Sequence, residues 1–499
     1  MFAPLFLLGL AWSPMNKLYF GDNLEVLKKL HKEYPSGLVD LIYIDPPFNS
    51  KRNYNVFFES IDLSDTKAQK EAFADTWSNV SYLDTLNEIK EFDLDLYNFL
   101  NALDQIRLSK GAISYLAIMA IRIWYMHKVL KDTGSFYLHC DSTMSHYLKL
   151  VCDLIFGEKN FRNEIVWCYR GAGYPKKDFG KRHDTILRYS KTDNYKFNLD
   201  EVREEYAETT KERFKHYIGN IRDGKDFGTQ SLHPLGKQPD DWWQIQPIAP
   251  SANERLGYPT QKPELLLERI IKASSDKGDT ILDCFCGCGT TIAVAENLNR
   301  NWIGVDISHL ATRLITKRLI DTYGLEIRKS FEVFGFPKDI ASAKELATGT
   351  KGGRLKFEGW IIEVMLHGVL NVQKNRTGFD GYLTFDIQGK KETVLIEVKS
   401  GNVNLPQVNH FITTVKEKNA GVGVFVCFKE QITPGMRQTA KKQGYYLEEF
   451  FGSNYDKIQI ITVEDLLEDK MINIPTSTKG TFKTAVRDNK KDKKQTTFL

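Results

Sequence analysis

Residues 41–50, LIYIDPPFNS, end an apolar run on a carboxylate, two prolines and an aromatic ring. Proline has no backbone N–H to give to a sheet, so the strand must end at Asp45. A carboxylate and a backbone carbonyl, fixed in advance by Pro46 and Pro47, can accept the two hydrogens of an aromatic amine and concentrate its lone pair for attack on an electrophilic methyl group. Phe48 offers a face on which a nucleobase turned out of its duplex can stack. We therefore predict that these four residues are catalytic, because a simple strand-ending turn would not explain the aromatic ring.

A second candidate site lies in residues 283–291, DCFCGCGTT, which join an apolar strand to a helix. Gly287 and Gly289 would let a ligand approach the backbone closely. Asp306 ends the next strand, 17 residues past Gly289, where a carboxylate would bond the hydroxyls of a ribose. The third glycine of the dinucleotide fingerprint is missing, and Thr290 and Thr291 follow Gly289 instead, which argues against NAD. The pattern indicates a nucleotide site, with a tight strand-to-helix connection and a helix cap at Asp306 as the alternative.

Cysteines alternate along this turn at Cys284, Cys286 and Cys288. Their spacing is not that of a zinc site, and no histidine or second cysteine pair lies nearby, so we expect no metal there. The chain has seven cysteines, an odd number without framework spacing, which favours a reducing cytosol over secretion.

A third set of residues lies within residues 354–466. Glu397 and Lys399 alternate along the strand ETVLIEVKSG and should project from one face, while Asp380 begins the preceding strand of a hairpin. Asp380 and Glu397 suit a hard divalent cation such as Mg²⁺, and Lys399 suits an activated water at a phosphodiester. Glu358, on the helix LKFEGWIIEVMLHGVL, is a further candidate acid. A solvated hairpin or a degenerate DNA-binding module would have the same pattern.

Alternating strands and helices must position the first two sites. From residue 16 to about 330 the pattern predicts an α/β fold with a mainly parallel sheet. LVDLIYID and SFYLHCD are expected strands, TMSHYLKLVCDLIFG is an expected helix, and YLAIMAIRIWYMHKVLKDTG is a helix expected to end on Gly134. Residues 162–249 lose regular periodicity and are locally basic, so we predict that they bind DNA through Arg170, Lys176, Lys177, Lys181 and Arg182.

These motifs resemble those of DNA amino-methyltransferases that use S-adenosyl-L-methionine. In that family Asp-Pro-Pro-Tyr/Phe is the catalytic motif and Phe-x-Gly-x-Gly the cofactor motif, here at Asp45 and Phe285. The catalytic motif comes first, which resembles the circularly permuted β group with its target-recognition region between two halves of a Rossmann-like domain. The segment YPTQKPELLLERII resembles the cofactor-side motif, which implies cofactor contacts from Lys262 and Pro263 as well as from Asp283, Gly287, Gly289, Thr290 and Asp306. Cys284 stands where the family usually has proline.

The resemblance also narrows the reaction. DPPFNS and FADTWS resemble the modification subunits of type III restriction systems. No cysteine follows a proline, which excludes methylation at the cytosine ring carbon. Cytosine-amino enzymes usually begin the catalytic motif with serine, so Asp45 favours the 6-amino group of adenine in duplex DNA. A methyltransferase acting on RNA or protein stays open as an alternative, and the basic insert argues against it.

The C-terminal segments GFDG and IEVKSG resemble the Mrr-like branch of the PD-(D/E)xK nucleases. This implies a smaller restriction-endonuclease-like α/β domain with a role in restriction–modification or defence. The alternative is a solitary adenine or cytosine methyltransferase whose C-terminal domain only binds DNA. A homodimer and a restriction or helicase partner subunit stay open. The expected organisation is an N-terminal extension (1–14), a catalytic half (15–161), a target-recognition region (162–249), a cofactor half (250–335), a linker (336–353), the nuclease-like domain (354–470) and a basic tail (471–499).

Composition is that of an ordinary soluble protein. The 499 residues are 42% hydrophobic and 26% charged, and the net charge of +4 permits an anionic partner. MFAPLFLLGLAWSP is too short to span a bilayer and lacks a basic n-region, so we expect no membrane partner. We expect the protein in a prokaryotic cytoplasm, associated with the nucleoid.

Overall fold

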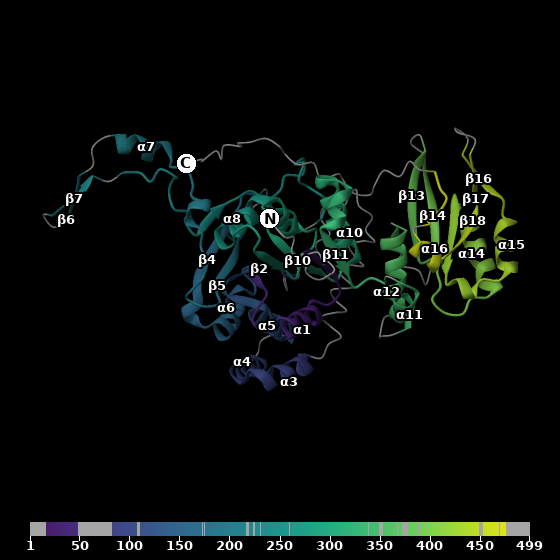
Figure 1. Ribbon diagram of the computed structural model, residues 1–499, viewed down its shortest axis with the longest axis horizontal. Coiled ribbons are helices and arrows are strands. Elements are labelled where there is room, and N and C mark those ends of the chain that lie inside the picture. Colours follow the sequence, from purple (N-terminus) through teal and green to yellow (C-terminus); the bar gives the residue numbers. More distant parts are fainter. Residues whose placement is uncertain are drawn as a thin grey trace, which may run out of the picture.

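A mixed sheet forms the centre of the protein in a computed structural model (Figure 1). The structure describes residues 16–475 except 48–81, 107–109, 172, 174, 216–218, 223–224, 230, 259, 338, 349–352, 367, 372–377, 388–389, 449–452 and 469. Among these residues the large sheet has nine strands, in the spatial order β11 (Phe331–Phe334), β1 (Asn16–Phe20), β10 (Asn301–Asp306), β9 (Thr280–Asp283), β2 (Val39–Ile44), β3 (Leu130–Cys140), β5 (His183–Ser190), β4 (Phe161–Cys168) and β8 (Trp242–Gln244).

The strand order interleaves segments that lie far apart in the sequence. Neighbouring strands from β11 to β3 are parallel, whereas β5 is antiparallel to both β3 and β4. The early strand β1 pairs with β10 and β11, and the early strand β2 pairs with β9. All six residues of β2 are buried, as expected for a strand covered on both faces.

Helices cover both faces of this sheet. One face carries α1 (Asn23–Glu33), α5 (Lys110–Val129) and α6 (Ser145–Phe156), with α3 (Tyr82–Phe92) and α4 (Leu94–Gln105) outside them. The other carries α8 (Glu264–Ser274), α9 (Thr290–Asn297) and α10 (His309–Tyr323). This is a doubly wound α/β arrangement, so the expected fold class is confirmed. None of the helices described is both long and apolar enough to cross a bilayer.

The predicted end of α5 is wrong. The helix ends at Val129, and β3 begins at once with Leu130, which pairs with Val39 of β2. Gly134 lies inside this strand, where an added Cβ would come within 2.5 Å of the Leu130 side chain. The polar sequence KDTG is typical of a helix end, but the sheet extends through it.

Residues 162–249 lose regular periodicity in the sequence, yet they contain regular strands and helices. β4, β5 and β8 belong to the large sheet, and η2 (Leu199–Val202) packs beside the end of α8. Of the elements described in this range, only α7 (Glu208–Lys215), β6 (Gly219–Arg222) and β7 (Lys225–Thr229) lie away from the sheet (Figure 1). The strand β5 escaped notice because Thr185, Arg188 and Ser190 are polar yet at most 4% exposed. Buried polar residues hide the apolar pattern by which a central strand is recognised.

A smaller α/β unit follows, on the right in Figure 1. Its described sheet has the order β12 (Val369–Leu370), β13 (Gly381–Ile387), β14 (Lys390–Val398), β15 (Val422–Cys427) and β18 (Ile458–Thr462), with a separate hairpin β16 (Tyr445–Glu448) and β17 (Ser453–Asp456). Its helices are α11 (Ile340–Thr348), α12 (Gly353–Gly359), the π-helical turn η4 (Trp360–Met365), α14 (Leu405–Glu417), α15 (Pro434–Lys441) and α16 (Val463–Leu467).

Two predicted boundaries around this unit need correction. Residues 336–353, expected to be a linker, contain α11, and its Ala343 and Ala347 belong to the core of the smaller unit. Ile472 and Ile474, expected in the basic tail, pack against the same core. The expected extension 1–14 and the tail beyond residue 475 lie outside the described residues.

Candidate active sites

Two carboxylates lie side by side at the carboxyl ends of two central strands of the large sheet. We call this end of the sheet the carboxyl edge. Asp45 directly follows β2, and Asp283 is the last residue of the neighbouring parallel strand β9. After β9 the chain continues to β10 on one side of the pair, and after β2 it continues to β3 on the other side. The strand order therefore reverses between β9 and β2. In open α/β sheets such a reversal leaves a crevice outside the carboxyl ends of the strands, and ligands bind there.

Asp45 forms an ion pair with Lys262, a residue far away in the sequence. The Lys262 ammonium donates to a carboxylate oxygen of Asp45, and the two side chains are only 12% and 16% exposed. Lys262 directly precedes Pro263, the N-cap residue of α8. The structure thus places Lys262, predicted on the cofactor side, against the predicted catalytic carboxylate. Pro46 and Pro47 follow Asp45 outside the strand, and Phe48, also predicted to be catalytic, lies outside the described residues.

The glycine turn between β9 and α9 requires its glycines. Gly287 and Gly289 have φ angles of 48° and 74°, in the left-handed region that side chains disfavour. A Cβ on Gly289 would lie 2.5 Å from Cγ1 of Ile315, and one on Gly287 would lie 3.2 Å from the ring of Tyr258. The turn therefore keeps its backbone free of side chains where a ligand would approach it.

The buried carboxylates Asp283 and Asp306 hold this turn in shape. Asp283 accepts from the Phe285 backbone N–H (3.0 Å) and from the Thr291 hydroxyl (2.6 Å). Burial raises the pKa of Asp283 to about 7. Asp306 accepts from the backbone N–H groups of Gly287 and Ser308, both at 2.8 Å, and burial raises its pKa to about 6.

Asp306 thus shapes the turn, while the cap of the next helix is Ser308, whose hydroxyl accepts from Ala311 N–H (3.4 Å). Asp45, Asp283 and Asp306 bring three carboxyl groups together here, and a cationic ligand beside them would favour the ionised forms of Asp283 and Asp306.

The remaining residues predicted for the turn pack inside it. Phe285 is half-buried against the core, and Thr290 is buried beside Cys288 and Arg318. Cys284, Cys286 and Cys288 are buried, and burial raises the pKa of each thiol. Within the described part of the chain, no three His, Cys, Asp or Glu side chains are placed to hold a metal ion.

Sequence reasoning missed a polar network beside Asp45. Tyr43 and His139, from β2 and β3, are buried and hydrogen-bonded, and His139 also contacts Asp184 of β5. Tyr169 donates to Asp184 as well, at 3.3 Å. Tyr43 stands two residues before Asp45, on an adjacent strand position of the same face. This two-residue spacing is the only feature of the sequence that indicates a place for Tyr43 beside the site.

A second missed group ties β1 to the glycine turn. Buried Arg122 of α5 donates to Asp22 (2.9 Å) and Asn23 (2.6 Å), and Asn23 donates to the Cys284 carbonyl (2.8 Å). Here the sequence carries a signal. FGDN follows its strand with an aspartate, as LIYID, TILD and NWIGVD do, so the carboxyl ends of the four neighbouring parallel strands β1, β10, β9 and β2 carry aspartates.

The predicted DNA-binding residues lie on the loop between β4 and β5. This loop leaves the sheet at the same edge, because β4 runs parallel to the other strands on either side of antiparallel β5. Arg170, Lys176, Lys177 and Lys181 are exposed. Arg182 is half-buried and donates to the Gly173 carbonyl, so it closes the loop.

The predicted acidic residues of the smaller unit come together. Lys399 pairs with Glu397 at the end of β14 and lies 3.8 Å from the Asp380 carboxylate, which also accepts from the Val398 N–H (2.9 Å). Burial raises the pKa of Glu397, and the Asp380 carboxylate raises it further. Glu358 is buried in α12 and accepts from Arg354 (2.9 Å).

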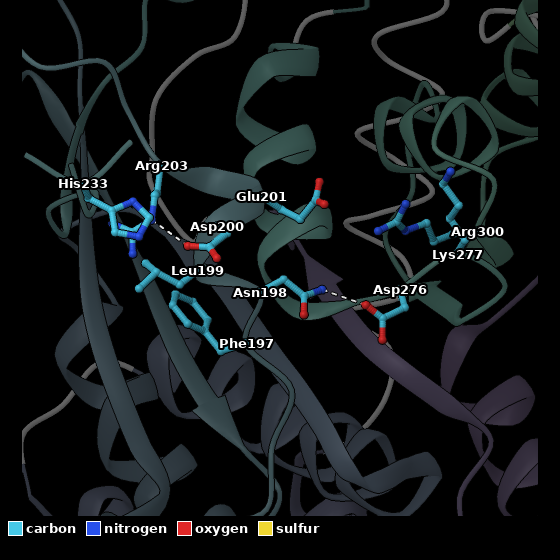
Figure 2. Close-up of a pocket in the computed structure, with 10 residues that line it drawn as sticks. All are labelled: Phe197, Asn198, Leu199, Asp200, Glu201, Arg203, His233, Asp276, Lys277 and Arg300. Atoms are coloured by element: carbon cyan, nitrogen blue, oxygen red, sulfur yellow. Dashed lines mark hydrogen bonds and ion pairs between the residues drawn. The ribbon is translucent and has the colours of Figure 1, made fainter. Parts of the chain in front are cut away.

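A cavity of about 930 Å³ lies at the opposite edge of the large sheet (Figure 2). Its lining is braced internally: Arg203 donates to Asp200 (2.6 Å) and Asn198 donates to Asp276 (2.9 Å). Arg300, beside the amino end of β10, donates to a backbone carbonyl at 2.7 Å. These pairs connect η2 to the start of β9 and stand apart from Asp45 and Asp283.

Comparison with known proteins covers both units. A family model described as DNA methylase matches residues 39–317, and one described as NACHT-associated inactive Restriction Endonuclease 1 matches residues 356–468. The chain is 30% identical over 302 residues to type II methyltransferase M.BglII of Bacillus subtilis, which covers 59% of this chain and 66% of that protein.

It is 30% identical over 303 residues to DNA adenine methyltransferase YhdJ of Escherichia coli (strain K12), covering 60% of this chain and 81% of that protein. It is 26% identical over 354 residues to the type III restriction-modification enzyme StyLTI Mod subunit of Salmonella typhimurium, covering 57% of this chain and 50% of that protein. The match thus spans just under two thirds of M.BglII and half of the Mod subunit.

Proposed function

This chain belongs to the DNA methylase family, and from that premise we propose that it methylates the exocyclic 6-amino group of adenine in duplex DNA, with S-adenosyl-L-methionine as methyl donor. The observation that carries the proposal is the pairing of β2 with β9, which sets Asp45 beside the glycine turn at the reversal of strand order. The aspartate that begins the Asp-Pro-Pro motif supports adenine over cytosine, as does the name of the relative YhdJ.

The residues of the glycine turn suit this cofactor. When bound, S-adenosyl-L-methionine supplies an electrophilic methyl group on a positively charged sulfur. Gly287 and Gly289 leave the backbone accessible. The positive sulfur of the cofactor would favour the ionised forms of Asp283 and Asp306, whose pKa values burial raises. Asp306 is the residue we assign to the ribose, with its carboxylate already bonded to the turn.

Asp45 and the backbone carbonyl held by Pro46 orient the target amine. They accept its two hydrogens, so the nitrogen lone pair is directed at the methyl group. Because the two acceptors are already fixed, little conformational entropy is lost on reaching the transition state. The nitrogen would gain the methyl group as the methyl–sulfur bond breaks, and the sulfur would leave as a neutral thioether. The extra proton on the nitrogen would then pass to the Asp45 carboxylate. Phe48 is assigned to stacking on the extruded base.

Expression in a host without DNA methylation tests this function. Wild type, Asp45→Ala and the control Asp200→Ala are expressed, and long-read sequencing reports the modified base with its sequence context. We expect methyladenine at one sequence motif for wild type and for the control, whose carboxylate lies at the opposite edge of the sheet. Asp45→Ala should leave that motif unmodified. Modified cytosine would move the proposal to the amino group of cytosine, and unmodified DNA from wild type would refute it.

For the smaller unit we propose DNA binding, with Mg²⁺-dependent cleavage as a second candidate that one observation favours. That observation is the contact of Lys399 with both Glu397 and Asp380. Asp380 and Glu397 would hold Mg²⁺, and Lys399 would stabilise charge developing at phosphorus. The matching family model describes inactive restriction endonucleases, which supports the binding role. We propose that the protein acts in restriction–modification, with a restriction or helicase subunit as partner. A homodimer is a further possible assembly, which a measurement of molar mass in solution would test.

A further inference from the structure

Phe179, in the loop between β4 and β5, is the most exposed large apolar side chain among the residues that the structure describes. It is 98% exposed, and Leu325 comes next at 73%. A single apolar side chain on a surface is common and assigns no role by itself. A role for Phe179 therefore has to come from the residues around it and from the place of its loop in the sheet.

The residues around Phe179 are basic. The sequence PKKDFGKR, residues 175–182, has four lysine and arginine side chains against the single acid Asp178. Lys176, Lys177 and Lys181 are all exposed. Ammonium groups neutralise phosphates, and an aromatic ring stacks on bases. Nucleic acid offers both phosphates and bases, so it suits the loop as a whole.

The loop stands on a fixed base. The backbone N–H of Tyr169 donates to the carbonyl of Arg182 (3.0 Å), which extends the pairing of β4 with β5 by one step. The guanidinium of Arg182 donates to the carbonyl of Gly173 and draws the two arms of the loop together. A loop that is already closed has less conformational entropy to lose on binding. Phe179 is thus presented on a preorganised support.

Hydrogen bonds also tie this base to the strand that leads to the catalytic carboxylate. The Tyr169 hydroxyl donates to Asp184 of β5 (3.3 Å), and Asp184 lies 3.4 Å from Nε2 of His139 in β3. Nδ1 of His139 lies 2.9 Å from the hydroxyl of Tyr43 in β2. Asp45 directly follows β2, so the loop and Asp45 are held on one frame at the carboxyl edge.

Phe179 and Asp45 can face the same turn of a duplex. Phe179 precedes the first residue of β5, His183, by four residues, which limits its Cα to roughly 14 Å from the end of that strand. β5 and β2 lie on either side of β3, about 10 Å apart. Together these spans reach roughly 24 Å, which is less than one helical turn of DNA, about 34 Å. A base turned out toward Asp45 would therefore leave its gap within range of Phe179.

We propose that Phe179 inserts into the base stack of the duplex and occupies the space that the flipped target base leaves. This inference rests on the proposed function, because it requires a base that has been turned out toward Asp45. Flipping costs the stacking of the target base on its neighbours, and an inserted aromatic ring replaces part of that stacking. The lysines beside Phe179 bind the phosphates near the gap. Phe48 is assigned to the extruded base, so the two rings stabilise different parts of the flipped state.

Single-turnover methylation with saturating enzyme tests the insertion. Wild type, Phe179→Ala, Phe179→Leu and the control Leu325→Ala act on a duplex that carries the motif modified by wild type. Phe179→Ala should be about tenfold slower than wild type, as expected for the loss of one aromatic–base stack. Phe179→Leu keeps an apolar wedge and should be slower by about threefold or less. Leu325→Ala should match wild type, because Leu325 lies just before β11, at the opposite edge of the sheet.

A mispaired target base separates insertion from a structural role. A mispaired base costs less to flip, so the loss of rate in Phe179→Ala should shrink to about twofold or less on a duplex mispaired at that base. Phe179 carries no charge, so the slope of log affinity against log salt should be the same for Phe179→Ala and wild type. An equal loss of rate on both duplexes, or a lowered slope, would mean that the variant had only distorted the loop, and either result would overturn the inference.

Fluorescence supplies a readout that does not depend on methyl transfer. Phe179→Trp should lose indole emission when the duplex is added, beyond any change in wild type, because the inserted ring would stack on bases. The absence of this additional quenching, or an unchanged methylation rate in Phe179→Ala, would also overturn the inference while the proposed function stands. A wild type that methylates no duplex would refute the proposed function itself, and the inference with it.

Discussion

Asp283 and Asp306 are both buried carboxylates at the glycine turn, yet their hydrogen bonds differ in kind. One oxygen of Asp283 accepts from a hydroxyl, which can reverse its role and accept in turn. Both oxygens of Asp306 accept from backbone N–H groups, which can only donate. An amide side chain could therefore replace Asp283 and keep both hydrogen bonds, but it would set two donors against each other at Asp306.

Asp283→Asn should flatten the pH dependence of stability. The folded pKa of about 7 lies above the usual value near 3.8, so the folded state binds the extra proton between these values. The free energy of unfolding of wild type therefore falls as pH rises through this window, by up to about 1.4 kcal/mol for each pKa unit of difference. The variant should match wild type near pH 4 and be more stable at pH 8, as measured by thermal unfolding across pH.

Asp306→Asn is the matched contrast. Its amide nitrogen would face a backbone N–H, which leaves a buried donor unsatisfied and costs about 1–3 kcal/mol of unfolding free energy. The variant should therefore have a lower melting temperature than wild type at every pH. Parallel curves for wild type and Asp283→Asn would mean that Asp283 is ionised in the folded protein at all these pH values.

At the scale of elements, local pattern predicted much of the α/β frame. The apolar run before Asp45 became β2, and the glycine turn became the β9–α9 connection, because both depend on residues adjacent in sequence. The pairing of Lys262 with Asp45 crosses 217 residues, and no local pattern encodes it. β5 was missed for a different reason. Arg188 and its polar neighbours are buried because β5 lies between β3 and β4, and this position depends on the assembled sheet and not on the local sequence.

The β4–β5 loop should contact DNA at the carboxyl edge of the sheet, where Asp45 lies. Charge reversal of its three exposed lysines, Lys176→Glu with Lys177→Glu and Lys181→Glu, should weaken duplex binding and reduce its salt dependence. The slope of log affinity against log salt should fall by about 0.9 for each phosphate that the loop no longer neutralises. Arg182 is left in place because it bonds within the loop.

The matched control reverses three exposed lysines at the opposite edge: Lys32, Lys277 and Lys329. It changes net charge equally, so it accounts for any effect of overall charge on binding. An equal change of slope in both triple variants would place the DNA track outside the β4–β5 loop.

At the scale of the whole molecule, the two units meet directly. α10 begins just after Asp306, and its Arg313 lies 3.4 Å from the Glu363 carbonyl in the π-helical turn η4. The acidic cluster of the smaller unit and the carboxylates of the large sheet nevertheless lie in units that have separate hydrophobic cores. Chemistry in one unit should therefore survive the loss of the chemical groups in the other.

Lys399→Ala should leave adenine methylation unchanged and remove any Mg²⁺-dependent cleavage. Wild type, Lys399→Ala, Asp45→Ala and the exposed control Lys416→Ala are incubated with methylated and unmethylated duplexes, with and without Mg²⁺, and the products are resolved by size. Cleavage by wild type and by Lys416→Ala, absent from Lys399→Ala, supports the second candidate. If wild type cuts neither duplex, DNA binding alone describes the smaller unit.

The interleaved strand order has a consequence for how the protein is made. β1 is finished at Phe20, but its partner β10 begins only at Asn301. At about 5–20 residues per second, a ribosome needs roughly 15–55 s to deliver that partner. During this time β1 and β2 exist without the neighbours that complete the site, so Asp45 has no glycine turn beside it. A nascent chain released early would lack a complete catalytic centre, and methylation should begin only after nearly two thirds of the chain has been translated.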